Sequence, residues 1–252
     1  MEKLRSAANP SKSALILYHA LWSALDLIYP PVCGGCEEPG SRWCDKCYQE
    51  TEIINQSTAC PHCGKPKTDG LICNECVEEP LPLEGIRSWA IYDGRLRQAI
   101  HSFKYQNNLS LGEVFSRYLI NLLLESDWKI DLIVPVPISL KKFHERGYNQ
   151  SNLLSRPIAM GLGIRNVPNA LRKLKNTPSQ VDLNAQERRM NLRDAFWADP
   201  VLIKNKRVLI IDDVITTGST LRSCAEALLQ AGTTGVFAAT LARPLLQFGD
   251  SA

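Results

Sequence analysis

Apolar residues follow three different patterns along this chain, and each pattern predicts a different kind of element. Residues 208–211 form a continuous apolar run, which is typical of a parallel strand buried on both faces. Residues 131–136 and 235–242 also predict core strands, whereas 86–92 alternate moderately and predict an edge strand. Helical spacing of apolar residues marks 13–28, 93–105, 109–125, 151–161 and 221–231.

Polar residues begin abruptly where the apolar run 208–211 ends. Asp212 and Asp213 come first, and a loop rich in Thr, Gly and Ser leads into the next helix. The loop residues are Thr216, Thr217, Gly218, Ser219 and Thr220. Backbone N–H groups, hydroxyls and a helix N-terminus make a phosphate cradle, and the two acids suit a ribose diol or Mg²⁺. A capped turn is the alternative, but capping needs one such residue and this stretch has six.

A second strand ends in a loop that also suits ligand binding. The chain passes from the strand at 131–136 into Pro135, Val136, Pro137, Ile138 and Ser139. Two prolines take the chain out of the sheet at once and stiffen the loop. Ligands of an open parallel sheet bind at the carboxyl ends of its strands, so we expect this loop beside the phosphate cradle. A proline-terminated strand followed by a solvated basic helix is the alternative.

The net charge of +3 is small, but the basic residues are unevenly distributed. Between positions 141 and 193, eleven basic residues are opposed by three acidic ones. A solvated helix face would mix the signs more evenly, so this segment predicts a polyanionic ligand: pyrophosphate, phosphoribosyl pyrophosphate (PRPP) or a nucleic-acid backbone. Within it, residues 165–185 are polar without strong periodicity, which predicts a mobile flap or a hairpin covering the site.

Eight of the nine cysteines form four Cys-x-x-Cys pairs, all before residue 77. Four thiolates give the closed tetrahedral shell of a structural zinc ion, so four pairs predict two such Zn²⁺ sites. We favour sequential pairing, with a cross-braced arrangement as the alternative. The sequential sites are Cys33, Cys36, Cys44 and Cys47, then Cys60, Cys63, Cys73 and Cys76. A segment with so few aliphatic residues needs its metals to fold.

The apolar stretch at 13–29 precedes the cysteines. It is too short for a bilayer span and is interrupted by His19, Ser23 and Asp26, and no signal-peptide cleavage site follows it. These features, and the absence of a convincing secretion signal, predict a soluble cytoplasmic protein with reduced cysteines and no membrane span. We expect the helix to pack its apolar face on the neighbouring zinc module, with docking to a membrane surface or a partner as the alternative.

Taken together, these motifs resemble the ComF family (ComFC in competence systems, GntX-like proteins in enterobacteria) over roughly residues 25 to 243. The Arg-Gly-aromatic-Asn-Gln string at 146–150 is the most specific shared motif. The helix before residue 25 is longer than the family leads us to expect. The other shared elements are Pro30-Pro31, the double zinc ribbon, Lys104-Tyr105, Pro135-Val136-Pro137, 177–180, 188–191 and the PRPP signature at 212–220.

The resemblance implies an α/β fold. We expect a type I phosphoribosyltransferase-like open, mostly parallel sheet with flanking helices at 84–245. A small cysteine-rich double zinc-ribbon domain at 31–79 and a helical extension at 1–30 would precede it.

The resemblance also implies roles for single residues. Asp212 and Asp213 would bind the ribose hydroxyls of PRPP, and the loop 216–220 its 5-phosphate, with Mg²⁺ accompanying the pyrophosphate. The loop 135–139 matches the pyrophosphate loop, and Arg146 is its candidate charge partner. Two further cations, Lys173 and Arg189, could close over the pyrophosphate from the flap.

The resemblance also implies a role in natural transformation. We expect a cytoplasmic DNA-uptake protein that handles single-stranded DNA with a ComFA-type helicase and other competence proteins, and that carries a PRPP site. An active phosphoribosyltransferase, which transfers ribose 5-phosphate from PRPP to an unidentified acceptor, is the alternative. A PRPP sensor without turnover is a third hypothesis. The sequence leaves turnover open.

Overall fold

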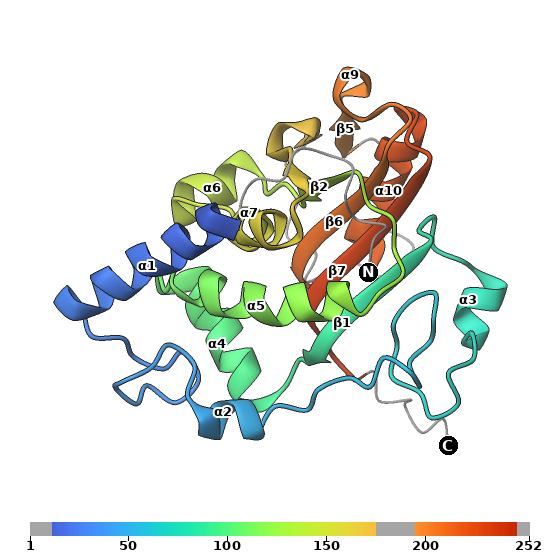
Figure 1. Cartoon of the computed structure of the whole chain (residues 1–252). Coiled ribbons are helices and arrows are strands. Elements are labelled where there is room, and N and C mark those ends of the chain that lie inside the picture. Colours follow the sequence, from blue (N-terminus) through green and yellow to red (C-terminus); the bar gives the residue numbers. More distant parts are fainter. Residues whose placement is uncertain (1–11, 175–194, 246–252) are drawn as a thin grey trace.

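Figure 1 shows the computed structural model of the chain, which describes residues 12–174 and 195–245. A central sheet of five parallel strands has the order β1-β7-β6-β2-β3. Its strands are β1 (Gly85–Ile91), β2 (Leu132–Pro135), β3 (Arg165–Asn166), β6 (Arg207–Val214) and β7 (Gly235–Arg243). A small antiparallel ribbon pairs β4 (Leu171–Lys173) with β5 (Phe196–Ala198). The expected open parallel sheet is confirmed, with β1 at one edge and β6 at the centre.

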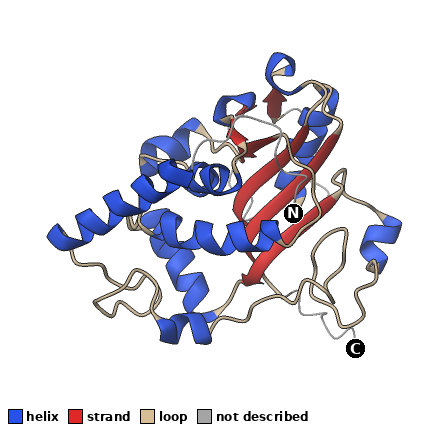
Figure 2. Cartoon of the chain, in the orientation of Figure 1, coloured by secondary structure: helices blue, strands red, loops and turns tan. Residues whose placement is uncertain are grey.

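Helices cover both faces of this sheet (Figure 2). Side chains of α4, α5 and α7 share one core with the sheet, and those of α10 share the other. The larger helices are α1 (Lys12–Ile28), α4 (Gly94–Tyr105), α5 (Leu111–Leu124), α6 (Leu140–Arg146), α7 (Gln150–Leu162) and α10 (Ser219–Gln230). The short ones are α2 (Asp45–Gln49), α3 (Asn74–Glu78), α9 (Pro200–Ile203) and a 3₁₀ turn at Pro168–Ala170.

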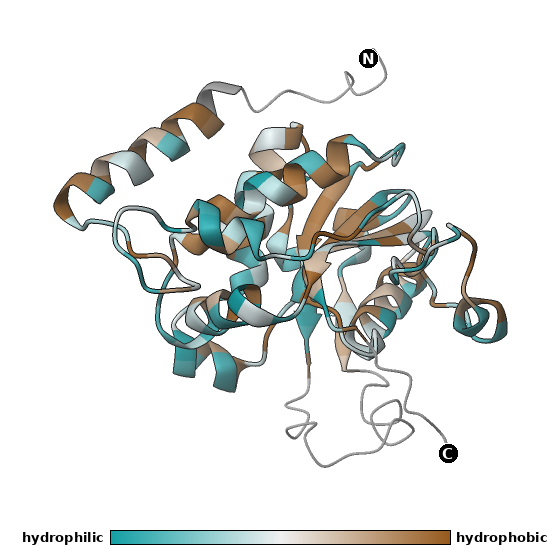
Figure 3. Cartoon of the chain, turned by 90° about the horizontal axis from the view of Figure 1, so that it is seen from below, coloured by the Kyte–Doolittle hydropathy of each residue, from teal (hydrophilic) through white to brown (hydrophobic). Residues whose placement is uncertain are grey.

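The central strand β6 is fixed by two separate cores, because successive strand residues point to opposite faces. Leu209 and Ile211 pack in the core that contains α4, α5 and α7, while Val208 and Ile210 pack in the core that contains α10. In Figure 3, apolar colour marks parts of the strands and of the helices beside them. All four side chains are fully buried, so replacing Ile210 by Ala should cost about 2–5 kcal/mol.

The first cysteine-rich module shares a core with the α/β domain. Trp43 is 7% exposed, and its ring lies 5.5 Å from that of Phe115 on α5. Cys33 and Cys47 belong to the same buried cluster. The second module is joined to the sheet by its backbone, because the N–H of Ile86 on β1 donates to the carbonyl of His62 at 2.8 Å.

The expected packing of helix α1 is wrong in one respect. Its apolar face was expected to be buried on the zinc module, but Leu17, Leu21 and Ile28 are 61%, 58% and 70% exposed. The first module reaches the helix through a polar contact instead, since Arg42 donates to Asp26 at 2.7 Å. Within the described ranges no helix, α1 included, is long and apolar enough to cross a bilayer.

The segment expected to form a flap, 165–185, only partly lies outside the main sheet. Arg165 and Asn166 form β3, which pairs with β2 and extends the sheet by one strand. A two-residue polar strand carries no periodic signal, which is why the sequence pattern missed it. Residues 175–194, which include the motifs at 177–180 and 188–191, lie outside the described residues.

Candidate functional site

The two loops picked out by sequence meet at one edge of the sheet. Strands β2 and β6 are parallel neighbours, with Pro135 opposite Ile211. The N–H of Val136 then donates to the carbonyl of Ile211 at 2.9 Å. The loop 135–139 therefore starts beside the point where β6 reaches Asp212 and Asp213.

The loop that was predicted to cradle a phosphate, 216–220, leads from β6 into the first turn of α10. Gly218 has φ +77°, a left-handed conformation that directs the chain into the helix. The hydroxyls of Thr217 and Ser219 lie 3.0 Å apart, and Thr216 and Thr217 are exposed. Thr220, like Ser219, belongs to the first turn of α10, whose free N–H groups and dipole favour an anion. The loop thus presents hydroxyls and backbone donors at the same point.

The acidic pair has a separate set of partners for each carboxylate. Asp213 is 7% exposed, and its Oδ1 lies 2.8 Å from the ammonium of Lys104 on α4. Asp212 accepts hydrogen bonds from the Ser151 hydroxyl and from the N–H of Asp213, both at 2.9 Å. Lys104 was noted in the sequence only as part of a shared motif, and no pattern connected position 104 with position 213.

Burial governs the ionisation of Asp212. Asp212 is mostly buried, and this desolvation, with the neighbouring charge of Asp213, raises its pKa to about 7. Burial opposes the charge on Lys104, but Asp213 and Asp212 outweigh it and the pKa of Lys104 is raised. One ammonium thus faces two carboxylates but pairs directly only with Asp213, so the pair retains negative charge that suits a diol or a cation.

The loop between α6 and α7 ties the two strand ends together. The Asn149 amide donates to the carbonyl of Val136 at 3.0 Å, and the Tyr148 hydroxyl donates to the carbonyl of Phe103 on α4. Ser151 follows directly and holds Asp212. The string Arg-Gly-Tyr-Asn-Gln is therefore structural in part, because it fixes the loop 135–139 against the acidic pair.

Two donors that flank this loop, at the end of α6 and the start of α7, are buried without a partner. The Arg146 Nε and Gln150 Nε2 atoms have no hydrogen-bond partner among the described residues. Buried donors are nearly always paired with protein, water or ligand. Both residues flank the segment 147–149, whose Asn149 bonds Val136, and a ligand rich in oxygen atoms would supply the acceptors that they lack.

Of the two expected flap cations, one is described. Lys173 lies on β4, with its ammonium 5.6 Å from the centre of the Phe196 ring. Burial and the positive charge of Lys142 lower the pKa of Lys173, so cations from β4 and α6 crowd one another here. Arg189 lies outside the described residues.

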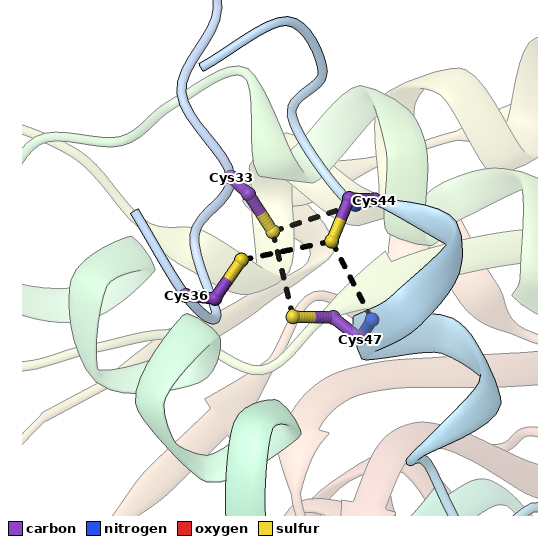
Figure 4. Close-up of side chains that lie close together, drawn as sticks. All are labelled: Cys33, Cys36, Cys44 and Cys47. Atoms are coloured by element: carbon purple, nitrogen blue, oxygen red, sulfur yellow. Dashed lines mark hydrogen bonds between the residues drawn. The ribbon is translucent and has the colours of Figure 1, made fainter. Parts of the chain in front are cut away.

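The first cysteine cluster has the geometry of a zinc site (Figure 4). The sulfurs of Cys33, Cys36, Cys44 and Cys47 all lie within 4.8 Å of one another. The Cys33–Cys47 and Cys36–Cys44 sulfur pairs are 3.6 Å apart, close to the ~3.8 Å edge of a tetrahedron with ~2.3 Å metal–sulfur bonds. The backbone N–H of Cys44 points at the Cys33 sulfur at 3.4 Å. These residues fit Zn²⁺.

The second cluster repeats this geometry with Cys60, Cys63, Cys73 and Cys76. Gly64, after the second cysteine, has φ +70°, and Glu37 takes the corresponding place in the first cluster with φ +64°. Burial would raise the pKa of Cys60, but backbone N–H groups outweigh it and bring that pKa to about 6, while burial raises the pKa of Cys76. The structure thus groups the cysteines sequentially, and the cross-braced alternative is not observed in the described residues.

The second cluster is connected to the phosphate loop. The His62 ring, which lies between two cysteines, is 3.2 Å from the carbonyl of Leu81, and Leu81 packs beside Gly218. On the other side of the cluster, Arg243 at the end of β7 is 3% exposed and donates to the carbonyl of Cys63 at 2.6 Å. A disturbance at this metal site would therefore reach the loop at 216–220.

Fold and site define a protein of two parts: a pair of Cys₄ zinc ribbons seated on a phosphoribosyltransferase-like α/β domain. Family models agree, since a double zinc ribbon domain matches residues 24–77 and a phosphoribosyl transferase domain matches 167–246. The chain belongs to the ComF family, as the sequence resemblance predicted.

Three relatives carry this assignment. DNA utilization protein YhgH of Escherichia coli (strain K12) is 31% identical over 229 residues, which cover 87% of this chain and 100% of the relative. Competence protein F of Haemophilus influenzae is 30% identical and covers 80% of this chain and 85% of its own length. Competence protein ComFC of Bacillus subtilis is 25% identical, with 84% of each chain covered.

Solved structures show a looser likeness. The match to a crystal structure of adenine phosphoribosyltransferase covers 57% of this chain and 75% of the chain of that enzyme, at 23% identity and a TM-score of 0.33. The match to the glutamine PRPP amidotransferase of B. subtilis covers 56% of this chain and 26% of the chain of that enzyme, at 22% identity and a TM-score of 0.35. Because these scores are low, the fold assignment rests on the sheet topology and the family match.

Proposed function

We propose that this protein acts in the cytoplasmic handling of incoming single-stranded DNA and that its α/β domain binds PRPP with Mg²⁺. The observation that carries the proposal is the acidic pair Asp212 and Asp213, in which Lys104 pairs with Asp213, between the loop 216–220 and the proline-stiffened loop 135–139. Relatives named for DNA utilization and for competence support the DNA-related part. A ComFA-type helicase is the partner that the family resemblance suggests.

Each part of PRPP has a counterpart at the sheet edge. The 5-phosphate would take the N–H groups and hydroxyls of the loop 216–220. The ribose diol would donate to Asp212, which Ser151 holds, and to Asp213, which Lys104 holds. The pyrophosphate would lie over the loop 135–139, with Arg146 and Lys173 as charge partners. Mg²⁺, when bound, would neutralise part of the pyrophosphate charge.

Calorimetric titration with PRPP and excess Mg²⁺ tests this site. We expect saturable binding that is lost in Asp213→Asn, because the diol loses an acceptor and Lys104 loses its counter-ion. Asp127→Asn, which changes an acidic residue outside the site, is the matched control and should bind as the unmodified protein does. Equal binding by Asp213→Asn would show that the acidic pair does not hold the ribose.

The strand-handling part is tested separately, by measuring the affinity for a labelled single strand over a range of salt concentrations. Basic residues that neutralise phosphates release counterions, so log affinity should fall with log salt by about 0.7 per contact. A flat dependence would contradict an electrostatic interaction with the strand.

The presence of both acids, Asp212 and Asp213, favours a second candidate function. This function is transfer of the phosphoribosyl group from PRPP to an acceptor. An acceptor nucleophile would form a bond to ribose C1 while the bond from C1 to pyrophosphate breaks, and the electron pair would leave with pyrophosphate. The acceptor's proton would pass to solvent. The protein would mainly position the reactants and stabilise the leaving charge. Release of pyrophosphate in the presence of Mg²⁺, PRPP and candidate bases would support turnover, and binding without release would favour a sensor.

A further inference from the structure

Helix α6 contributes no residue to the buried core. All seven of its residues are at least partly exposed, with Leu140 at 72% and Phe143 at 46%. Its ends are nevertheless well formed, because the Ser139 hydroxyl accepts from the N–H of Lys142 at 3.3 Å and Gly147 closes the helix with φ +77°. Surface helices normally bury their apolar residues. A capped helix that exposes them presents its side chains to something outside the domain.

The end of α4 supplies a second exposed ring next to α6. Tyr105 is 59% exposed, and the guanidinium of Arg146 lies 4.6 Å from its ring centre while donating to its hydroxyl at 3.1 Å. The His101 ring lies 4.8 Å from the Tyr105 ring. Phe143 precedes Arg146 by one helical turn, so the two share a face of α6. Exposed rings and a fixed cation therefore alternate across this surface.

The charge of the same surface is strongly positive. Lys141 is exposed, and its only acidic neighbour on α6, Glu145, is 4.0 Å away at the limit of an ion pair. Lys142 lies close enough to Lys173 to lower that residue's pKa. Cations interleaved with exposed aromatic rings match a polyanion whose planar groups are free to stack. Paired duplex bases are not free in this way, and an acidic protein surface would satisfy the cations but leave the rings uncovered.

We propose that α6, Tyr105 and His101 form the surface that holds a single nucleic-acid strand, with bases stacked on Phe143 and Tyr105 and phosphates on the α6 cations. This inference rests on the proposed strand handling and adds to it the location of the strand. Arg146 belongs to this surface and is also the charge partner proposed for the pyrophosphate of PRPP. The strand therefore runs directly past the PRPP site, and the zinc ribbons do not supply the principal strand contact.

Two substitutions away from the PRPP-binding residues test the surface by fluorescence anisotropy with labelled oligothymidylate. Phe143→Ala should weaken binding about tenfold with little change in salt dependence, because it removes a stacking contact. Lys142→Gln, which removes the cation one turn before Arg146 on the same face of α6, should instead reduce the slope of log affinity against log salt by about 0.7. Matched controls are Tyr29→Ala, which removes another exposed ring (74%), and Lys206→Gln, which lies before the opposite end of β6. Both should bind as the unmodified protein does.

The outcomes separate this inference from the function on which it rests. If the unmodified protein fails to bind the strand, strand handling itself is wrong. If it binds with a steep salt dependence but both α6 variants match it, the function stands and the location is overturned. An abasic strand that binds as well as oligothymidylate would overturn the stacking contacts. Crosslinking of a 5-iodouracil strand to peptides containing Phe143 or Tyr105 would support the location, and crosslinking to the zinc ribbons alone would contradict it.

Discussion

Replacing Asp212 by Asn should stabilise the fold in a strongly pH-dependent way. The pKa of Asp212 is raised from 3.8 to about 7 by burial and by Asp213. Between those values the folded state binds more protons than the unfolded state, so stability falls as pH rises from about 4 to about 7. Above pH 7 the folded protein holds a poorly solvated charge. Asn has nearly the same shape, carries no charge, and can still accept from Ser151.

The size of the effect follows from the shift. A change of one pKa unit corresponds to about 1.4 kcal/mol, so a shift of about 3 units sets an upper limit of about 4 kcal/mol. The difference in stability builds up between pH 3.8 and about pH 7, and about half of this pH range lies between pH 5.5 and pH 7. The advantage of Asp212→Asn over the unmodified protein should therefore grow by about 1–2 kcal/mol between pH 5.5 and pH 8.5. The same substitution should weaken PRPP binding, because the ribose loses an acceptor.

Urea denaturation of zinc-loaded protein at the two pH values measures this growth, and comparing it between pH values cancels any constant effect of the new amide. Asp69→Asn is a control of opposite sign. The N–H of Leu71 and the ammonium of Lys67 lower the pKa of Asp69, so its substitution should bring no gain at high pH. An advantage that is constant with pH, or that shrinks as pH rises, would refute the proposed desolvation of Asp212.

Three further predictions concern the metal sites and the buried ion pairs. Cys60→Ser should lower the zinc content by one ion per chain, measured by mass spectrometry, and an unchanged content would contradict the second site. Arg243→Met should speed chelator capture of one zinc ion about tenfold, because the bond to the Cys63 carbonyl is lost; uniform release of both ions would argue against this role. Glu113→Ala should cost about 3 kcal/mol in urea denaturation, because Arg42, 3.0 Å away and 9% exposed, loses a buried partner. A loss below 1 kcal/mol would mean that Asp26 suffices for Arg42.

The parts of the fold that the sequence predicted well are those with strong periodic signals. The apolar run 208–211 predicted a strand of the interior, which is confirmed, and its abrupt change to Asp212 predicted where that strand leaves the core. The cysteine spacing likewise predicted two closed four-sulfur sites. In each case the signal is local, because one run or one turn contains all the residues that create it.

Long-range contacts could not be predicted in this way. The pairing of Lys104 with Asp213 joins positions more than a hundred residues apart, and nothing in either local pattern requires it. Helix α1 was expected to bury its apolar face, since its spacing is amphipathic, but spacing does not say whether a partner surface lies opposite. The sequence also did not predict that Phe143 and Tyr105 are exposed, because aromatic residues within a helix are usually buried.

A crystal structure of the protein with PRPP and Mg²⁺ would test the central claim most directly. The account predicts the 5-phosphate on the N–H groups of the loop 216–220, the ribose hydroxyls on Asp212 and Asp213, and the pyrophosphate over the loop 135–139. PRPP bound elsewhere, or an empty sheet edge at saturating ligand, would contradict it.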